Sequence, residues 1–190
     1  MPASWPRHEM GTTGPSPTPA AELTLMDATS NAPERTSVLF VCLGNICRSP
    51  LAEGVFRHLV EEEGLEDRFE IDSAGTGAWH VGELPDGRAA LIAQQHGIDL
   101  ESRARQVQEE DFDRFDYVIA MDHENLRALN RMRDASGSDV SVELLRAFDD
   151  DSSDGDEVPD PYYGGASGFE NVYQMVRRSC KGLLKELRAA

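Results

Sequence analysis

The chain has 190 residues, a formal net charge of −17 at pH 7 and 39% hydrophobic residues, which suits one domain with a tail. The negative charge argues against general nucleic-acid binding and against adhesion to anionic membranes. Three cysteines are too few for a secreted disulfide framework, and neither a membrane span of ~20 apolar residues nor a signal peptide is recognisable, so we expect a cytoplasmic protein.

Residues 1–35 are rich in Pro, Thr, Ser, Ala and Gly. Such a composition buries too little apolar surface to offset the entropy lost on ordering. We therefore expect a disordered N-terminal tail, with Met26 as a second candidate start. Residues 36–190 are expected to form the folded domain.

From residue 36 onward, strand patterns alternate with helical patterns. Apolar runs predict strands at residues 37–41, 69–73, 117–121 and 142–145. Helical spacing predicts helices at residues 49–63, 86–96, 109–114, 123–133 and 168–188, with an acidic loop at 149–157. This alternation predicts an α/β fold, in which a parallel sheet carries helices on both faces and binds ligands at the carboxyl ends of its strands.

The first predicted strand ends at Cys42, and a short loop separates it from a helix that opens at Ser49. A thiol attacks as the thiolate, and free N–H groups at a helix N-terminus favour negative charge. Gly44 and Asn45 suit the positive φ that turns successive amides inward around an anion. The loop therefore predicts an anion site with a thiol beneath it.

Two further side chains complete this pattern. Arg48 supplies a planar fork that matches phosphate oxygens, and Ser49 is placed to donate its hydroxyl to the sulfur. A strand-end cysteine is often only a small core residue, and C-x5-R occurs by chance. The added Gly, Asn and Ser, with a buried strand before them and a helix after, favour nucleophilic phosphoryl transfer by Cys42.

The segment VLFVCLGNICRSPLAE, residues 38–53, resembles the active-site segment of the low-molecular-weight protein tyrosine phosphatases. Shorter similarities follow at residues 72–75, 96–98, 104–106, 115–117, 121–122 and 160–164, so the match runs from about residue 35 to the end. The resemblance implies a three-layer fold with a four-stranded parallel sheet and a phosphate-binding loop after the first strand. It also implies hydrolysis of phosphotyrosine on proteins, among them bacterial tyrosine kinases, with no metal or cofactor.

Asp160 is the candidate general acid, which must protonate the leaving group. Pro159 and Pro161 flank it and stiffen the loop. Asp160 also matches the acid of the family's D-P-Y motif, and the same carboxylate would later act as base toward water. The alternative is a plain acidic turn that continues residues 149–157.

The resemblance also implies the walls of a substrate pocket. Tyr162 and Tyr163 would stack on a phenyl ring, Trp79 would line the opposite wall, and we expect Leu43 at the pocket floor. Ordinary loop packing is the alternative for each aromatic residue.

Other residues are expected to support the loop. Asn45 should hold a positive φ while its side chain contacts Ser73. Asp122 either orients Arg48 or caps the helix at residues 123–133. Ser102 stands where many relatives have a histidine that supports the phosphate loop, so we expect the network around Asn45 to differ.

Cys47, also in the loop, is either a small core filler or a resolving thiol that protects oxidised Cys42. Three other functions compete with phosphotyrosine hydrolysis. Arsenate reductase needs further redox cysteines, and residues 48–179 contain none. Protein-arginine phosphatases tend to carry Thr where this chain has Ile46. An idle phosphoprotein-binding module would require loss of Cys42 or Asp160.

Overall fold

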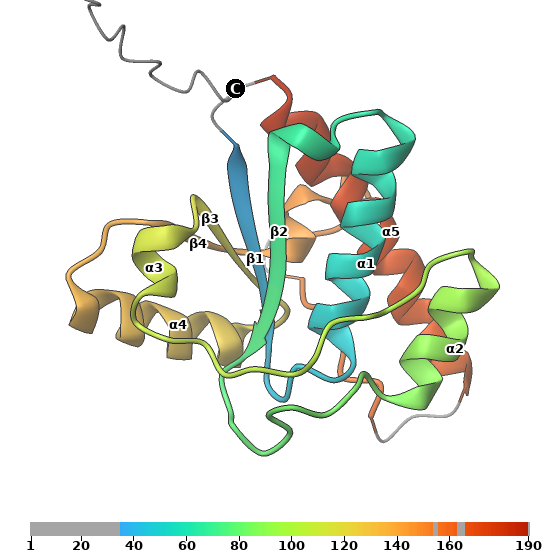
Figure 1. The fold of residues 1–190 in the computed structure, drawn as a ribbon, viewed down its shortest axis with the longest axis horizontal. Coiled ribbons are helices and arrows are strands. Elements are labelled where there is room, and N and C mark those ends of the chain that lie inside the picture. The colour runs from blue at the N-terminus through green and yellow to red at the C-terminus, as the bar shows by residue number, and fades with distance from the viewer. Residues whose placement is uncertain (1–34, 154–155, 163–165, 190) are drawn as a thin grey trace, which may run out of the picture. The chain divides into compact units, whose positions relative to one another are not determined.

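The computed structural model describes residues 35–153, 156–162 and 166–189. Four parallel strands form one sheet in the order β2-β1-β3-β4 (Figure 1). They are β1 (Thr36–Cys42), β2 (Phe69–Gly75), β3 (Tyr117–Ala120) and β4 (Ser141–Leu144). The four-stranded parallel sheet expected from the sequence is confirmed.

Helices cover both faces of this sheet. The α-helices are α1 (Arg48–Glu62), α2 (Gly87–Gln95), α3 (Asp111–Arg114), α4 (His123–Ser136) and α5 (Ala166–Leu187). Helices α1, α2 and α5 lie on one face, and α3 and α4 lie on the other (Figure 1). The predicted three-layer α/β fold is therefore confirmed.

The central strand β1 shows why the sheet is buried. Its side chains alternate between two cores, because successive residues of a strand point to opposite faces. Val38, Phe40 and Cys42 belong to the core beneath α1 and α5, whereas Leu39 and Val41 belong to the core beneath α3 and α4. The continuous apolar run thus reflects a strand covered on both faces.

Several boundaries differ from the predictions. Helix α4 continues to Ser136 and ends at Gly137, whose φ of 79° is the left-handed cap that glycine favours. Strand β2 continues to Gly75. Two 3₁₀ helices, η1 (Glu66–Arg68) and η2 (Leu145–Phe148), were not predicted, because three or four residues are too short to show a periodic pattern.

The topology places a crevice at one edge of the sheet. The chain leaves β1 through α1 on one face and leaves β3 through α4 on the other (Figure 1). Ligands of open parallel sheets bind where the connections diverge in this way, beyond the carboxyl ends of the strands. In the described part of the chain, no helix combines the length and the apolar character needed to cross a membrane.

Candidate active site

The loop between β1 and α1 places hydrogen-bond donors around the sulfur of Cys42. We call residues 42–49 the phosphate loop. The backbone N–H of Asn45 donates to Cys42 Sγ over 3.3 Å, and Ser49 Oγ lies 3.0 Å from the same sulfur. Ser49 Oγ is also 3.2 Å from the carbonyl oxygen of Ala74. Because a hydroxyl has one hydrogen, Ser49 donates to Ala74 beside a thiol and to the sulfur beside a thiolate.

Asn45 determines the shape of this loop. Its φ of 54° is the only positive φ of a non-glycine residue in the part of the chain that the structure describes. Its side-chain amide donates to Ser49 Oγ and to Ser73 Oγ, each over 2.9 Å, and its Oδ1 accepts the backbone N–H of Arg105 over 2.9 Å. Three hydrogen bonds therefore hold the unfavourable backbone conformation, and the predicted positive φ and contact with Ser73 are confirmed.

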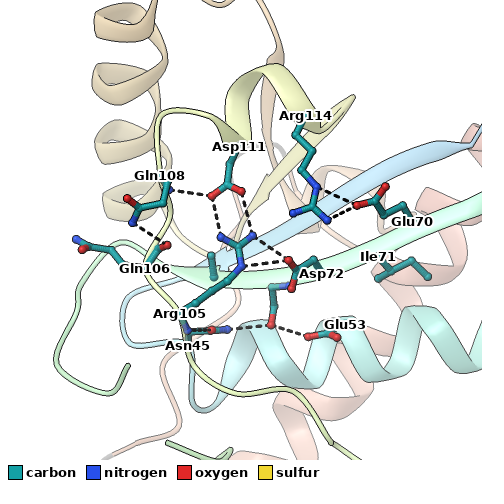
Figure 2. A network of polar contacts seen from close by, with 12 residues as sticks. Asn45, Glu53, Glu70, Ile71, Asp72, Arg105, Gln106, Gln108, Asp111 and Arg114 are labelled. Carbon is teal, nitrogen blue, oxygen red and sulfur yellow. Dashed lines mark hydrogen bonds and ion pairs between the residues drawn. The ribbon is translucent and has the colours of Figure 1, made fainter. Parts of the chain in front are cut away.

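A polar network continues outward from the Ser73 hydroxyl, which bonds to Asn45 and to Glu53, the two labelled residues at the ends of this chain of contacts in Figure 2. The Ser73 hydroxyl donates to Glu53 Oε2 over 2.7 Å, and Arg57 donates to Glu53 Oε1 over 3.0 Å. With Ser102 in the position of the histidine, we expect the network around Asn45 to differ. In the structure the Ser73 hydroxyl donates to the Glu53 carboxylate, so a charged group lies one hydrogen bond beyond the partner of Asn45.

Arg105 supports the other side of Asn45. Its guanidinium donates to Asp72 over 3.1 Å and to both oxygens of Asp111 over 2.8 and 3.1 Å (Figure 2). Burial alone would lower the pKa of Arg105, but Asp111 and Asp72 outweigh it and raise that pKa. The backbone N–H of Arg105, which donates to Asn45, is thus held in place by the ion pairs of the charged Arg105 side chain.

The guanidinium of Arg48 lies beside the sulfur and is almost fully buried. Its NH1 donates to Asp122 Oδ2 over 2.6 Å and to the carbonyl of Val158 over 3.2 Å, and its NH2 donates to Asp160 Oδ2 over 3.0 Å. Burial would lower the pKa of Arg48, but the nearby Cys42, Asp122 and Asp160 raise it. The arginine therefore stays charged, and its remaining N–H groups suit an anion.

Asp122 performs both of the roles that the sequence left open. One carboxylate oxygen orients Arg48, and the other accepts the backbone N–H of Asn125 over 2.7 Å and so caps α4. Because the cap fixes the carboxylate to the start of a helix, the direction of the Arg48 fork is fixed as well.

Asp160 is the exposed partner of Arg48, since 42% of its side chain is accessible. Its other oxygen accepts the backbone N–H of Tyr162 over 3.0 Å. The backbone N–H of Val158 donates to the carbonyl of Met121 over 2.8 Å, which ties this segment to the end of β3. The carboxylate is therefore held at the edge of the site and remains open to solvent.

These segments enclose a cavity of about 260 Å³. It is lined by Cys42, Leu43, Gly44, Ile46, Cys47, Arg48, Trp79, His80, Asp160 and Tyr162. The predicted nucleophile, arginine, acid and aromatic walls therefore meet in one place. Leu43 is 42% exposed, so it lies at the rim and not at the expected floor. Tyr163 lies outside the described residues.

Arg88 makes contacts that the sequence did not indicate. Its guanidinium donates to both oxygens of Asp86 over 2.9 and 2.8 Å and to the carbonyl of Tyr162 over 2.9 Å. The backbone N–H of Asp86 donates to the carbonyl of Ile46 over 2.7 Å. Arg88 therefore links the phosphate loop to the segment of Asp160. An exposed helical arginine carries no pattern that reveals this, although Asp86 could have been recognised as a helix cap.

Cys47 is buried in the phosphate loop, close enough to Cys42 to interact with it electrostatically. Burial, with the nearby Asp86, Cys42 and Asp160, raises the pKa of Cys47 to about 12, so this thiol is protonated at neutral pH. Burial also raises the pKa of Cys180, which lies in the core beneath α1 and α5. All three cysteines of the chain are free thiols.

The comparisons with known proteins agree with this geometry. A family model described as low molecular weight phosphotyrosine protein phosphatase matches residues 37–190. A low molecular weight protein-tyrosine-phosphatase of Streptomyces coelicolor is 49% identical over 152 residues, covering 80% of this chain and 93% of the relative.

Two crystal structures show the same fold. YfkJ from Bacillus subtilis has 43% identity and a TM-score of 0.76, covering 82% of this chain and 96% of its own. DARP, a drosophila arginine phosphatase, has 37% identity and a TM-score of 0.74, covering 80% and 97%. The family model and these identities establish that the chain belongs to the low molecular weight phosphotyrosine protein phosphatase family.

Proposed function

We propose that this protein hydrolyses phosphotyrosine on proteins through a cysteinyl-phosphate intermediate. The observation that carries the proposal is the meeting of Cys42, Arg48 and Asp160 in one cavity with Trp79 and Tyr162 at its rim. The cavity offers a nucleophile, an anion clamp and an acid at its centre and flat apolar surface at its mouth. A phosphorylated phenol matches both parts.

In the first step, the phosphate dianion binds to the loop amides and to Arg48. The dianion replaces the carboxylate of Asp160 as partner of the Arg48 NH2 group, which frees Asp160 to serve as the proton donor. The thiolate of Cys42 then attacks phosphorus, so the S–P bond forms while the P–O bond to the tyrosine breaks. Asp160 gives its proton to the departing phenolate oxygen.

In the second step, water attacks the cysteinyl phosphate. The carboxylate of Asp160 takes a proton from the water as its oxygen bonds to phosphorus, and the S–P bond breaks. Inorganic phosphate and the Cys42 thiolate are released. Ser49, 3.0 Å from the sulfur, stabilises the leaving thiolate with its hydroxyl hydrogen.

Protein-arginine phosphatase activity is the second candidate, because DARP, titled an arginine phosphatase, is among the similar structures. Against it, Ile46 lines the cavity with a branched side chain that crowds a guanidinium more than a flat ring.

Assays of p-nitrophenyl phosphate, a phosphotyrosine peptide and a phosphoarginine peptide, with Cys42→Ser as blank, test the proposal. We expect kcat/KM for phosphotyrosine to exceed that for phosphoarginine by at least about tenfold, the factor that ~1.4 kcal/mol of discrimination gives. Faster hydrolysis of phosphoarginine would reverse the assignment.

The partner is proposed to be a phosphotyrosine protein, with a bacterial tyrosine kinase as the first candidate and the cytoplasm as the location. A substrate-trapping pull-down with Asp160→Ala would identify it. We also propose that residues 36–190 form the catalytic domain and residues 1–35 a tail outside it, so a chain that starts at Met26 should keep the kcat/KM of the full chain.

A further inference from the structure

Most of the large apolar side chains that remain exposed belong to the cavity or to a loop that lines it. In the described part of the chain the exposed ones are Leu43, Trp79, Val81, Leu84, Leu91 and Tyr162, of which Leu91 lies apart, on α2. Single exposed apolar residues are ordinary on a protein surface, but a cluster beside a binding cavity indicates a contact surface. Leu43, Trp79 and Tyr162 line the cavity itself, and Val81 and Leu84 lie in the loop that contains Trp79.

We call residues 78–85 the rim loop, and its backbone is attached to the phosphate loop at both ends. The N–H of Gly77 donates to the carbonyl of Leu43 over 2.9 Å, and the N–H of Asp86 donates to the carbonyl of Ile46 over 2.7 Å. Val81 is two residues from Trp79, and Leu84 is two residues from Asp86. Since consecutive Cα atoms are ~3.8 Å apart, the Cα of Val81 lies within about 8 Å of that of Trp79, which lines the cavity. The Cα of Leu84 lies within about 8 Å of that of Asp86, which is bonded to the phosphate loop.

The rim loop is also held at its centre. The N–H of Gly82 donates to the carbonyl of Ala104 over 2.7 Å, and the N–H of Ala104 donates to the carbonyl of Glu83 over 2.9 Å. Val81 and Leu84 stand on either side of this attached pair and are 58% and 57% exposed. Val81 and Leu84 are therefore exposed on a loop whose backbone is held at both ends and at its centre. A loop that is already ordered loses less conformational entropy when it binds a partner.

Trp79 is fixed in a similar way by Gly77. A Cβ on Gly77 would lie 1.8 Å from the indole ring of Trp79, so the ring packs directly on the glycine backbone. The side chain is nevertheless 72% exposed. An indole that is supported on one face and open on the other is a preorganised platform for an apolar partner.

We propose that Trp79, Val81 and Leu84 bind the polypeptide on one side of the phosphotyrosine and that the enzyme prefers apolar residues there. The inference deepens the proposed function and rests on it. An extended peptide advances ~3.3 Å per residue, so residues two to four positions from the phosphotyrosine reach across a loop of this size. Their apolar side chains would leave water on contact with the rim loop.

The charge of the rim disfavours acidic peptides. Glu83 stands between Val81 and Leu84 with 59% of its side chain exposed, and its carboxylate is 2.8 Å from His80 Nδ1. The chain as a whole has a net charge of −17. Acidic residues beside the phosphotyrosine would therefore meet like charge, so the occupant is an apolar segment and not an acidic one.

The test compares kcat/KM for three phosphotyrosine peptides whose flanking residues are Leu and Val, Ser, or Glu. We expect kcat/KM for the apolar peptide to exceed that for the serine peptide by about tenfold, because two or three apolar groups are buried on binding. The acidic peptide should have the lowest kcat/KM. In Val81→Asn/Leu84→Asn the ratio of apolar to serine peptide should fall close to one. Because both peptides are measured on the same variant, a partial loss of folded enzyme cancels in the ratio.

Leu91→Asn is the matched control, since Leu91 is 54% exposed but lies on α2 outside the rim loop. It should keep the full preference. Equal rates for the three peptides in the unmodified chain, or a preference that survives the double variant, would overturn the inference. So would self-association that the double variant abolishes without any change in peptide preference, because the occupant would then be a second copy. Failure of the proposed function is distinct, since no phosphotyrosine peptide would then be hydrolysed above the Cys42→Ser blank.

Discussion

The phosphate loop and the rim loop lie at the same edge of the sheet but are stabilised differently. Asn45, Arg48 and Ser49 are at most 3% exposed, and their side chains bond to partners inside the protein. The rim loop instead fixes its backbone and leaves Val81 and Leu84 more than half exposed. Buried polar groups are costly to leave unpaired, whereas exposed apolar groups are replaced at little cost. Substitutions in the phosphate loop should therefore lower both stability and turnover, whereas substitutions of Val81 or Leu84 should leave the fold intact and change only the peptide preference.

The largest effect is expected at the reacting sulfur. Cys42→Ser should lower kcat for p-nitrophenyl phosphate by at least ~10⁴-fold, as loss of a catalytic nucleophile does. Acid-quenched unmodified enzyme should carry a phosphate adduct on Cys42 by mass spectrometry. A serine variant that keeps an appreciable rate, or the absence of any adduct on the unmodified enzyme, would contradict the proposed intermediate.

The next effect is expected at the exposed end of the site. Asp160→Asn removes the proton donor, which should lower kcat for a phosphotyrosine peptide by about 10²–10³-fold. The loss should be smaller for p-nitrophenyl phosphate, because its leaving group is more acidic and needs protonation less. Comparison of the two substrates on the same variant checks this, and equal losses would show that Asp160 positions groups and does not act as the acid.

Two substitutions of Asn45 separate the contribution of its hydrogen bonds to stability from the contribution of its positive φ. Asn45→Ala loses three hydrogen bonds and places a Cβ at positive φ, so the free energy of unfolding should fall by about 2–4 kcal/mol. Asn45→Gly supplies the positive φ without the hydrogen bonds and should recover ~1 kcal/mol of that loss. Urea denaturation measures both. Equal stability of the two variants would mean that φ contributes nothing.

Arg88 links Asp86, which is bonded to the phosphate loop, to the segment of Asp160, and its loss should have an intermediate effect on turnover. Arg88→Ala releases Tyr162 from Asp86, so Asp160 should be less well positioned and kcat should fall by about tenfold. Arg88→Lys should recover only part of the rate, since an ammonium lacks the fork. Arg68→Ala, an exposed arginine of η1 near the start of β2, is the control. An unchanged rate in Arg88→Ala would show that the Asp160 segment holds its position unaided.

Arg88 also gives this link a pH dependence. The hydrogen bond from Arg88 lowers the pKa of Asp86 below its ordinary value, so the carboxylate stays charged above that value. The stabilisation is therefore present at neutral pH and is lost as the pH falls through the lowered pKa. In Arg88→Ala the free energy of unfolding should therefore decrease less steeply as the pH is lowered than it does in the unmodified chain.

The smallest effect on turnover is expected at Cys47. Cys47→Ser should change kcat by less than about threefold, since this thiol does not react with substrate. After peroxide converts Cys42 to its sulfenic acid, Cys47 would form a disulfide with release of water. Because the pKa of Cys47 is raised to about 12, its thiolate fraction and the disulfide rate should rise with pH from 7 to 9. Mass spectrometry of the disulfide checks this, and a rate independent of pH would favour the filler role.

Much of the site could be read from contiguous residues. Cys42, Asn45, Arg48 and Ser49 lie within one short segment between a strand and a helix, and backbone geometry brings such neighbours together in almost any context. Asp160 was recognised from its two prolines and the D-P-Y match. The strands and longer helices followed from periods of apolar residues, which local geometry dictates.

Contacts across the chain could not be predicted in the same way. Arg105 reaches Asn45 from 60 positions away, and Arg48 reaches Asp160 from 112 positions away. The direct bond from Ser73 to Glu53 depends on how α1 packs on β2.

The sequence alone determined the class of fold and identified Cys42 and Arg48 as the proposed nucleophile and anion clamp, because these depend on residue type and spacing within single elements. Only the tertiary structure decided which groups support Asn45, that Arg88 joins Asp86 to the Tyr162 carbonyl, and that the rim loop is attached to the phosphate loop. Hydrogen bonds between distant residues depend on the packing of whole elements, and no local pattern encodes that packing.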